Sequence, residues 1–125
     1  MELSEIASEI HQTAVDHGWW EGVETAEEIH QDIGIKLLLA HSEISEAVED
    51  WRGMESLETL NLILFRENEQ GTGFTKPVGF PTEIADTIIR LLDLAQFIGI
   101  DIERVILDKM EYNKTRSYRH EGKSA

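Results

Sequence analysis

The chain contains only two prolines, Pro77 and Pro81, and both lie within one five-residue stretch. Proline removes a backbone hydrogen-bond donor and interrupts helices, so the rest of the chain is free to form long helices. Apolar residues recur at steps of three and four, the spacing of one helical face, and no segment alternates apolar and polar residues with the period of two typical of strands. We therefore expect an all-α fold, an antiparallel bundle of four or five helices.

Capping and stop signals place four main helices in the sequence. They are expected over residues 3–17, 26–51, 81–98 and 102–116. Thr25 and Glu28 have the spacing of a capping box at the start of the second helix, and Asp101 suits the N-cap of the fourth. Residues 54–79 are expected to form a short helix followed by a loop.

The apolar side chains of these helices are the expected core. In the second helix they are Ile29, Ile33, Leu37, Ala40, Ile44, Val48 and Trp51, in the third Ile84, Ile88, Leu91 and Ala95, and in the fourth Ile102, Val105, Ile106 and Met110. The consecutive Leu37, Leu38 and Leu39 point in all directions around the second helix, which predicts burial on every side there.

The opposite face of the third helix is polar. It carries Glu83, Asp86, Arg90 and Asp93. Such a stripe is typical of a solvated surface. Leu94 and Phe97 lie on the same face, however, and an aromatic ring among charged residues indicates that another helix or another subunit covers it.

The length and charge narrow the possible functions. The chain has 125 residues, enough for one compact domain that spans residues 1–125. It carries 25 acidic residues against 11 lysines and arginines, a formal net charge of -14. This balance excludes a binder that tracks the phosphates of a nucleic acid polymer, and it favours cations as partners.

The sequence also narrows the cellular setting and the available chemistry. It has no cysteine, which excludes disulfides, thiolate catalysis and zinc fingers. It contains no apolar run long enough for a membrane span, and its first residues do not form a basic and then apolar leader. These observations predict a cytoplasmic protein that makes no membrane contact.

Pairs of carboxylates three residues apart are the first candidates for chemistry. Two such side chains lie one helical turn apart and can bind one cation together, and Mg2+ and Mn2+ prefer oxygen ligands. The spacing recurs throughout this acidic chain, so context selects among the pairs. Glu43 and Glu46 follow the leucine triplet in the middle of a helix. Glu83 and Asp86 lie in the first turns of the strongly apolar third helix.

A stripe of hydrogen-bond donors on the fourth helix is the second candidate. It consists of Lys109, Asn113 and Arg116, at steps of four and three. A lysine ammonium and an arginine guanidinium both suit phosphate oxygens. The alternative is that these cations offset neighbouring acids near a helix C-terminus, where cations are favoured.

The ordered set of these motifs resembles the MazG-like family of all-α nucleotide pyrophosphohydrolases. The resemblance rests on Glu43-x-x-Glu46, on Glu83-x-x-Asp86 and on Lys109 with Asn113 and Arg116, together with the stretches Lys76–Pro81 and Gly99–Asp101. It covers about residues 29–53 and 76–123, and residues 54–75 have no counterpart in it.

The resemblance implies hydrolysis of nucleoside triphosphates between the α and β phosphates, which yields a monophosphate and pyrophosphate. It implies that Glu43, Glu46, Glu83 and Asp86 hold Mg2+, with Mn2+ as a substitute, and that Lys109, Asn113 and Arg116 face the phosphates. Either Glu43 or Glu46 could accept the proton of the attacking water. Members of the family are homodimers or homotetramers with sites near subunit contacts, so oligomerisation is expected to complete the bundle.

A nucleobase needs a flat partner, and Trp19 and Trp20 lie directly after the first helix. We expect these rings to stack on the base, with His11 lining the same pocket. The alternative for two adjacent tryptophans after a helix is one ring in the core and one on the surface.

Other classes of protein fit parts of the sequence. A non-enzymatic acidic helical interaction protein, such as a nucleic-acid mimic or another partner-binding module, would explain the net charge and would show no metal dependence. A carboxylate-bridged di-iron bundle needs two Glu-x-x-His units, and the chain contains only Glu27-x-x-His30. An EF-hand is excluded because its Asp-rich, Gly-centred loop is absent.

Overall fold

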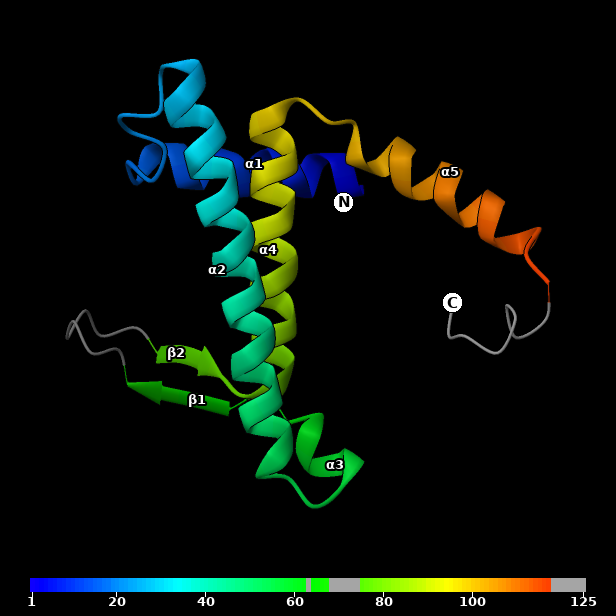
Figure 1. The fold of residues 1–125 in the computed structure, drawn as a ribbon. Coiled ribbons are helices and arrows are strands. Elements are labelled where there is room, and N and C mark those ends of the chain that lie inside the picture. The colour runs from blue at the N-terminus through cyan, green and yellow to red at the C-terminus, as the bar shows by residue number, and fades with distance from the viewer. Residues whose placement is uncertain (63, 68–74, 118–125) are drawn as a thin grey trace.

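The computed structural model describes residues 1–62, 64–67 and 75–117, and these residues form five helices and one small sheet (Figure 1). In chain order the elements are α1 (Leu3–Asp16), α2 (Ala26–Arg52), α3 (Leu57–Leu60), β1 (Leu64–Glu67), β2 (Thr75–Val78), α4 (Phe80–Ile98) and α5 (Ile102–Lys114). The predicted fold class is confirmed in its main feature, since the structure is mostly helical.

The helix ends follow the signals in the sequence. At the start of α2 the Thr25 hydroxyl accepts from the Glu28 N–H at 3.1 Å, and the Glu28 carboxylate accepts from the Thr25 N–H at 3.0 Å. The Asp101 carboxylate accepts from the Arg104 N–H at 3.2 Å at the start of α5. Gly99 ends α4 with a left-handed φ of 89°, which glycine adopts without steric cost. The expected boundaries of the four main helices are confirmed to within two residues.

An antiparallel pair of helices, α2 and α4, makes the most extensive contact in the part of the chain that the structure describes (Figure 1). α1 packs across one end of this pair, mainly against α4. The β1–β2 hairpin lies beside the other end of the α2–α4 pair (Figure 1). α5 extends away from the pair. The arrangement leaves one side of the α2–α4 contact open toward the hairpin, where the pocket described below is located.

The expectation for residues 54–79 is confirmed for the short helix, which is α3, and wrong for part of the loop. β1 and β2 form an antiparallel sheet in which Leu64 pairs with Val78 and Phe65 pairs with Pro77. Each strand has four residues, too few to show a repeating alternation in the sequence. Residues 68–74, where the sequence predicts the rest of the loop, lie outside the described residues.

Gly79 makes the turn from β2 into α4. Its φ of 102° lies in the region that favours glycine, and a Cβ there would lie 3.5 Å from the Leu62 carbonyl oxygen. Pro81 follows in the first turn of α4, where a backbone N–H has no partner within the helix. The tight turn brings the hairpin and the first turns of α4 to the same pocket.

A buried cluster joins α1 to α4 at the end opposite the hairpin. It contains Ala14, Trp20 and Leu94. The Trp20 ring stacks on Phe97 with centroids 3.9 Å apart and an angle of 5° between the ring planes. The sequence predicts a cover over Leu94 and Phe97, and α1 with the turn after it provides that cover. Because the cover belongs to the same chain, these two residues give no support for a subunit contact.

Asp93 is the polar centre of this cluster. Each of its carboxylate oxygens accepts from the Trp20 indole N–H at 3.1 Å, and one of them lies 2.7 Å from His11 Nδ1. The residue is 9% exposed, and a carboxylate buried to this degree needs such partners to offset its lost hydration. The cover expected over this face of α4 is therefore present at Asp93, and the alternative of a solvated stripe does not describe this end of the helix.

Much of the expected apolar core lies on the outside of the chain. The side of α2 that is buried carries the small residues Ala40 and Ala47. Larger apolar residues point elsewhere, and Leu38, Trp51 and Ile88 are 69%, 58% and 50% exposed. Other exposed members of the expected core are Leu37, Leu39, Ile44, Val48, Ile84, Leu91, Val105, Ile106 and Met110. These predictions are wrong for the single chain, because helical spacing identifies an apolar stripe and cannot show whether the same chain covers it.

The exposed area of the chain reflects this arrangement. The chain exposes 9742 Å² of surface, and a compact monomer of 14.3 kDa exposes about 6,800 Å². The difference of about 2,900 Å² also includes residues 63, 68–74 and 118–125, which lie outside the described part of the chain. Exposed apolar side chains along α2, α4 and α5 account for part of this area, and such surfaces are typical of protein contacts.

We expect Asp93→Ala to lower the free energy of unfolding by about 2 kcal/mol, because the substitution leaves the Trp20 N–H buried without an acceptor. Denaturant unfolding followed by circular dichroism measures the change. Asp108→Ala is the matched control, since Asp108 is exposed and pairs with Arg104 at 3.2 Å on the surface of α5. The control should change stability by less than about 0.5 kcal/mol. Equal stability of the two variants would contradict the role assigned to Asp93.

Candidate functional site

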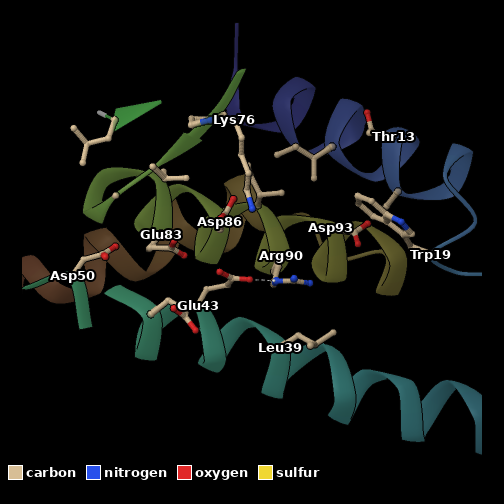
Figure 2. A pocket seen from close by; sticks show the side chains of 18 of the residues that line it. Thr13, Trp19, Leu39, Glu43, Asp50, Lys76, Glu83, Asp86, Arg90 and Asp93 are labelled. Carbon is tan, nitrogen blue, oxygen red and sulfur yellow. Dashed lines mark hydrogen bonds and ion pairs between the residues drawn. The ribbon is translucent and has the colours of Figure 1, made fainter. Parts of the chain in front are cut away.

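A pocket of about 1150 Å³ lies between α2, α4 and the hairpin and reaches the end of α1 (Figure 2). This volume is slightly above the range of about 300–1,000 Å³ typical of sites that bind small molecules and cofactors. Six carboxylates and four cationic side chains line the pocket. A cavity with so many titratable groups is a candidate active site on physical grounds.

Three carboxylates meet at the centre of this pocket. Glu43 of α2 and Glu83 and Asp86 of α4 each bring one carboxylate oxygen to within 4.8 Å of the other two. Glu83 and Asp86 lie one turn apart on α4, and Glu43 faces them from the neighbouring helix (Figure 2). The structure therefore brings together three of the four carboxylates that the sequence predicts as metal ligands.

Two further carboxylates of α2 line the pocket outside this group. Glu46, the fourth predicted ligand, lines the pocket without joining the three-carboxylate group. Asp50, which the sequence analysis missed, also lines it. Asp50 lies seven residues after Glu43, and this spacing places both side chains on one face of the helix. The signal was present in the sequence, but in a chain this acidic it does not stand out.

The two α4 carboxylates of the group hold their protons more tightly than usual. Burial, the hydrogen bond with Glu43 and the negative charge of Asp86 raise the pKa of Glu83 to about 7, and Asp50 adds to this effect. Burial and the charge of Glu43 raise the pKa of Asp86, while the positive charges of Arg90 and Lys76 oppose that increase. The site thus contains more negative charge than its surroundings offset.

Arg90 supplies a positive charge to the group from α4. Its Nε donates to Glu43 Oε1 at 3.0 Å. Arg90 follows Asp86 by four residues and Glu83 by seven, so the three side chains share one face of the helix (Figure 2). A metal ion bound to Glu43 would compete with Arg90 for the same carboxylate.

The three-carboxylate group fits a hard divalent cation. Mg2+ and Mn2+ prefer oxygen ligands and usually keep several waters, so carboxylates on one side of an open pocket suit them. The group contains no histidine or cysteine, the nitrogen and sulfur ligands typical of Zn2+. A divalent cation would also offset the repulsion that raises the pKa of Glu83. The group could therefore bind a metal ion.

Trp19 lines the pocket at the end away from Asp50 (Figure 2). Its side chain is 59% exposed, so part of the ring is free to contact a ligand. The Lys36 ammonium donates to the Trp19 carbonyl oxygen at 3.1 Å and fixes the backbone at this point. The location is consistent with the base-stacking role predicted for Trp19.

Trp20 and His11 belong to the buried cluster around Asp93 and do not line the pocket. Phe97 stacks on the Trp20 ring, and the Lys36 ammonium lies 4.7 Å from its centroid, so neither face of the ring is open to a nucleobase. The base-binding role predicted for Trp20 and His11 does not fit this position. The alternative for adjacent tryptophans, one ring in the core and one on the surface, describes what the structure shows.

The predicted phosphate-binding residues lie outside the pocket of their own chain. α5 extends away from the α2–α4 pair (Figure 1). It carries Lys109 and Asn113, and Arg116 lies just after its C-terminal end, so none of the three lines the pocket. The Lys109 ammonium and the Arg116 guanidinium carbon lie 4.7 Å and 5.9 Å from the centroid of the Tyr112 ring. Phosphate binding by these three residues stays a prediction, and it requires a second copy of the chain.

Two cations of the hairpin, Arg66 and Lys76, line the pocket, and the sequence analysis assigned them no role. Lys76 stands in the Lys76–Pro81 stretch, and Arg66 stands in the segment that has no counterpart in the family resemblance. Their position follows from strands that the sequence does not predict. No pattern of spacing could have connected them with the carboxylates.

Comparison with known proteins found no match among family models, curated proteins or solved structures. We therefore infer a function from the geometry of the pocket together with the sequence motifs. A search of the described helices found none that combines the length and the apolar character needed to cross a membrane.

We expect Glu83→Gln to raise the melting temperature of the metal-free protein at about pH 8. The pKa of Glu83 rises from 4.5 to about 7 on folding, so the folded state binds more protons than the unfolded state between these values. The stability that this group contributes is fully present below about pH 4.5 and is lost as the pH rises through about 7. Glutamine removes the ionised form and with it the repulsion.

Thermal unfolding with a chelator at about pH 5 and about pH 8 measures this effect. The difference between Glu83→Gln and the wild type should be larger at the higher pH. Glu111→Gln is the matched control, because Glu111 is exposed on α5 and pairs with Lys114 at 2.8 Å. If Glu83→Gln melts no higher than the wild type at about pH 8, the proposed repulsion does not exist.

Proposed function

We propose that this protein is a magnesium-dependent nucleotide pyrophosphohydrolase, which converts ribo- or deoxynucleoside triphosphates into monophosphates and pyrophosphate and so clears the nucleotide pool. The observation that carries the proposal is the three-carboxylate group at the centre of a pocket that also holds an exposed tryptophan. A nucleoside triphosphate has a flat base, oxygens that bind metal ions, and negative charge, and the pocket has groups that suit each feature. The motif resemblance to the MazG-like family supports the same reaction.

In this proposal Glu43, Glu83 and Asp86 hold Mg2+. These residues would hold the ion against the phosphates, where its positive charge would offset the negative charge that develops during the reaction. Glu46 lines the pocket outside the three-carboxylate group, so its carboxylate is not needed to hold Mg2+. We therefore favour Glu46 over Glu43 as the group that accepts the proton of the attacking water.

The nucleoside is proposed to extend toward Trp19. The exposed indole ring at that end of the pocket offers a face for stacking on the base. Stacking does not distinguish one base strongly from another. We therefore expect Trp19 to support binding of several nucleotides, with selectivity coming from other groups.

A homodimer or homotetramer is part of the proposal. The apolar surfaces of α2, α4 and α5 support it, and so does an exposed area above that of a compact monomer. α5 contacts α1 and α4 but buries none of its residues, and a helix of 13 residues is marginal in water without packing, so a partner that covers α5 would stabilise it. A second copy that covers these surfaces would complete the antiparallel bundle, and it could bring Lys109, Asn113 and Arg116 to a neighbouring pocket.

Ile88→Lys should shift the protein toward the monomer. The substitution puts a charge in the middle of the exposed apolar face of α4, where burial in an interface would be costly. Size-exclusion chromatography with light scattering measures the mass. Gln12→Lys adds the same charge on the exposed face of α1 and should leave the oligomer intact. A monomeric wild type would contradict this part of the proposal.

The proposed reaction is tested with a panel of ribo- and deoxynucleoside triphosphates, with and without Mg2+. Chromatography should show monophosphate and pyrophosphate, and no diphosphate, only when Mg2+ is present. Glu43→Gln and Asp86→Asn should each lower turnover by more than about 100-fold, above the loss typical of residues that only orient a metal ligand. Glu111→Gln is the control for the loss of one carboxylate and should keep full activity.

The acidic interaction protein remains the other candidate, and the net charge of -14 favours it. It predicts no turnover of any nucleotide in this panel. It also predicts no change in melting temperature when Mg2+ or Mn2+ is added. Both results together would replace the proposed enzyme with this alternative.

A further inference from the structure

The pocket has a positively charged wall opposite its carboxylates. Arg66 of β1 and Lys76 of β2 both line the pocket, and they face each other in the antiparallel register of the hairpin. Two like charges directly opposite each other disfavour strand pairing. The register of the hairpin thus places two cations side by side on the wall of the pocket, where both could contact one anion.

Lys76 is placed to contact such an anion. Its side chain reaches from the hairpin toward Asp86 and Arg90 at the centre of the pocket (Figure 2). Among the described residues, no carboxylate lies close enough to the Lys76 ammonium to form an ion pair with it. Arg90 differs in this respect, because Glu43 accepts from its Nε at 3.0 Å.

Trp19, the three carboxylates and the two hairpin cations line the same pocket, and their positions indicate which part of a nucleotide Arg66 and Lys76 would contact. A nucleoside stacked on Trp19 would lay its phosphates along the carboxylate centre, where the Lys76 side chain ends (Figure 2), and its β- and γ-phosphates would lie farther from Trp19 than its α-phosphate. These two phosphates carry most of the negative charge of the substrate. A lysine ammonium binds them as a point charge, and an arginine guanidinium can bind two oxygens at once.

We propose that Arg66 and Lys76 bind the β- and γ-phosphates of the nucleoside triphosphate and make the enzyme select triphosphates over diphosphates. This inference rests on the proposed function. Arg66 and Lys76 would recognise the pyrophosphate leaving group. The water oxygen bonds to the α-phosphorus, the bond from that phosphorus to the bridging oxygen breaks, and the water proton passes to a pocket carboxylate. Pyrophosphate leaves with the bonding electrons, and the two cations offset its charge.

Arg66 and Lys76 are not among the phosphate-binding residues that the family resemblance implies. Lys109, Asn113 and Arg116 come from α5, which lies away from this pocket in the same chain. Arg66 belongs to the segment that has no counterpart in the resemblance. The hairpin would therefore supply phosphate contacts from the chain that also supplies the carboxylates.

Steady-state kinetics of Arg66→Ala, Lys76→Ala and the double variant test the inference. Each single substitution should lower kcat/KM for a nucleoside triphosphate by about tenfold or more, the loss expected for a hydrogen bond between charged groups. The value for the matching diphosphate, hydrolysed to monophosphate and phosphate, should fall less, so the preference for triphosphate shrinks. Lys76→Arg keeps the charge and should retain most of the preference.

Arg52→Ala is the matched control, because Arg52 is an exposed cation at the end of α2 that pairs with Glu49 at 3.3 Å outside the pocket. It should leave both substrates unaffected. If the wild type releases pyrophosphate and the hairpin variants keep the full preference for triphosphate, the inference is wrong and the proposed function stands.

Calorimetric titration with inorganic pyrophosphate and Mg2+ gives a readout that does not depend on turnover. The wild type, Lys76→Arg and Arg52→Ala should bind pyrophosphate, and Lys76→Ala and Arg66→Ala should bind it at least about tenfold more weakly. If no variant differs from the wild type, the hairpin does not bind phosphate. If the wild type binds pyrophosphate through these cations but hydrolyses no nucleotide, the phosphate site stands and the proposed function fails.

Discussion

The contact between α2 and α4 determines both the fold and the candidate site. Ala40 and Ala47 are buried on α2, and their small side chains let the two helices approach. Glu43 lies between these alanines and reaches Glu83 and Asp86 on the other helix. Placing three carboxylates in a helix contact costs free energy, which is the physical cause of the raised pKa of Glu83. A divalent cation bound by these carboxylates would offset this cost.

The same contact explains why so much apolar surface is exposed. With the charged stripe of α4 facing inward, Ile88 and its apolar neighbours face outward, and no other described part of the chain covers them. Within the chain, the Trp20 ring stacks on Phe97 beside Asp93 and so stays covered. An assembly would therefore serve two purposes in this account. It would cover the apolar faces of the helices, and it could bring the α5 residues predicted to bind phosphate to the pocket of a neighbouring chain.

Sequence reasoning succeeded where the signal is local. The capping box of Thr25 and Glu28 and the glycine at position 99 define helix ends, because each depends on a few neighbouring residues. Three of four predicted metal ligands meet in space, since motif spacing places them on facing helices. Prediction failed where the outcome depends on the tertiary partner. Spacing could not show that the polar face of α4 points inward, that Trp20 is enclosed by Phe97 and Lys36, or that residues near Arg66 form a strand.

A titration of Mn2+ into the metal-free protein tests the central claim most directly, because the electron paramagnetic resonance signal of free Mn2+ falls as the ion binds. The account predicts that the wild type and Glu111→Gln bind Mn2+, and that Mg2+ displaces it. It also predicts that Glu43→Gln and Asp86→Asn bind it at least about tenfold more weakly. Equal binding by all four proteins, or no binding by the wild type, would contradict a metal site at the contact of α2 and α4.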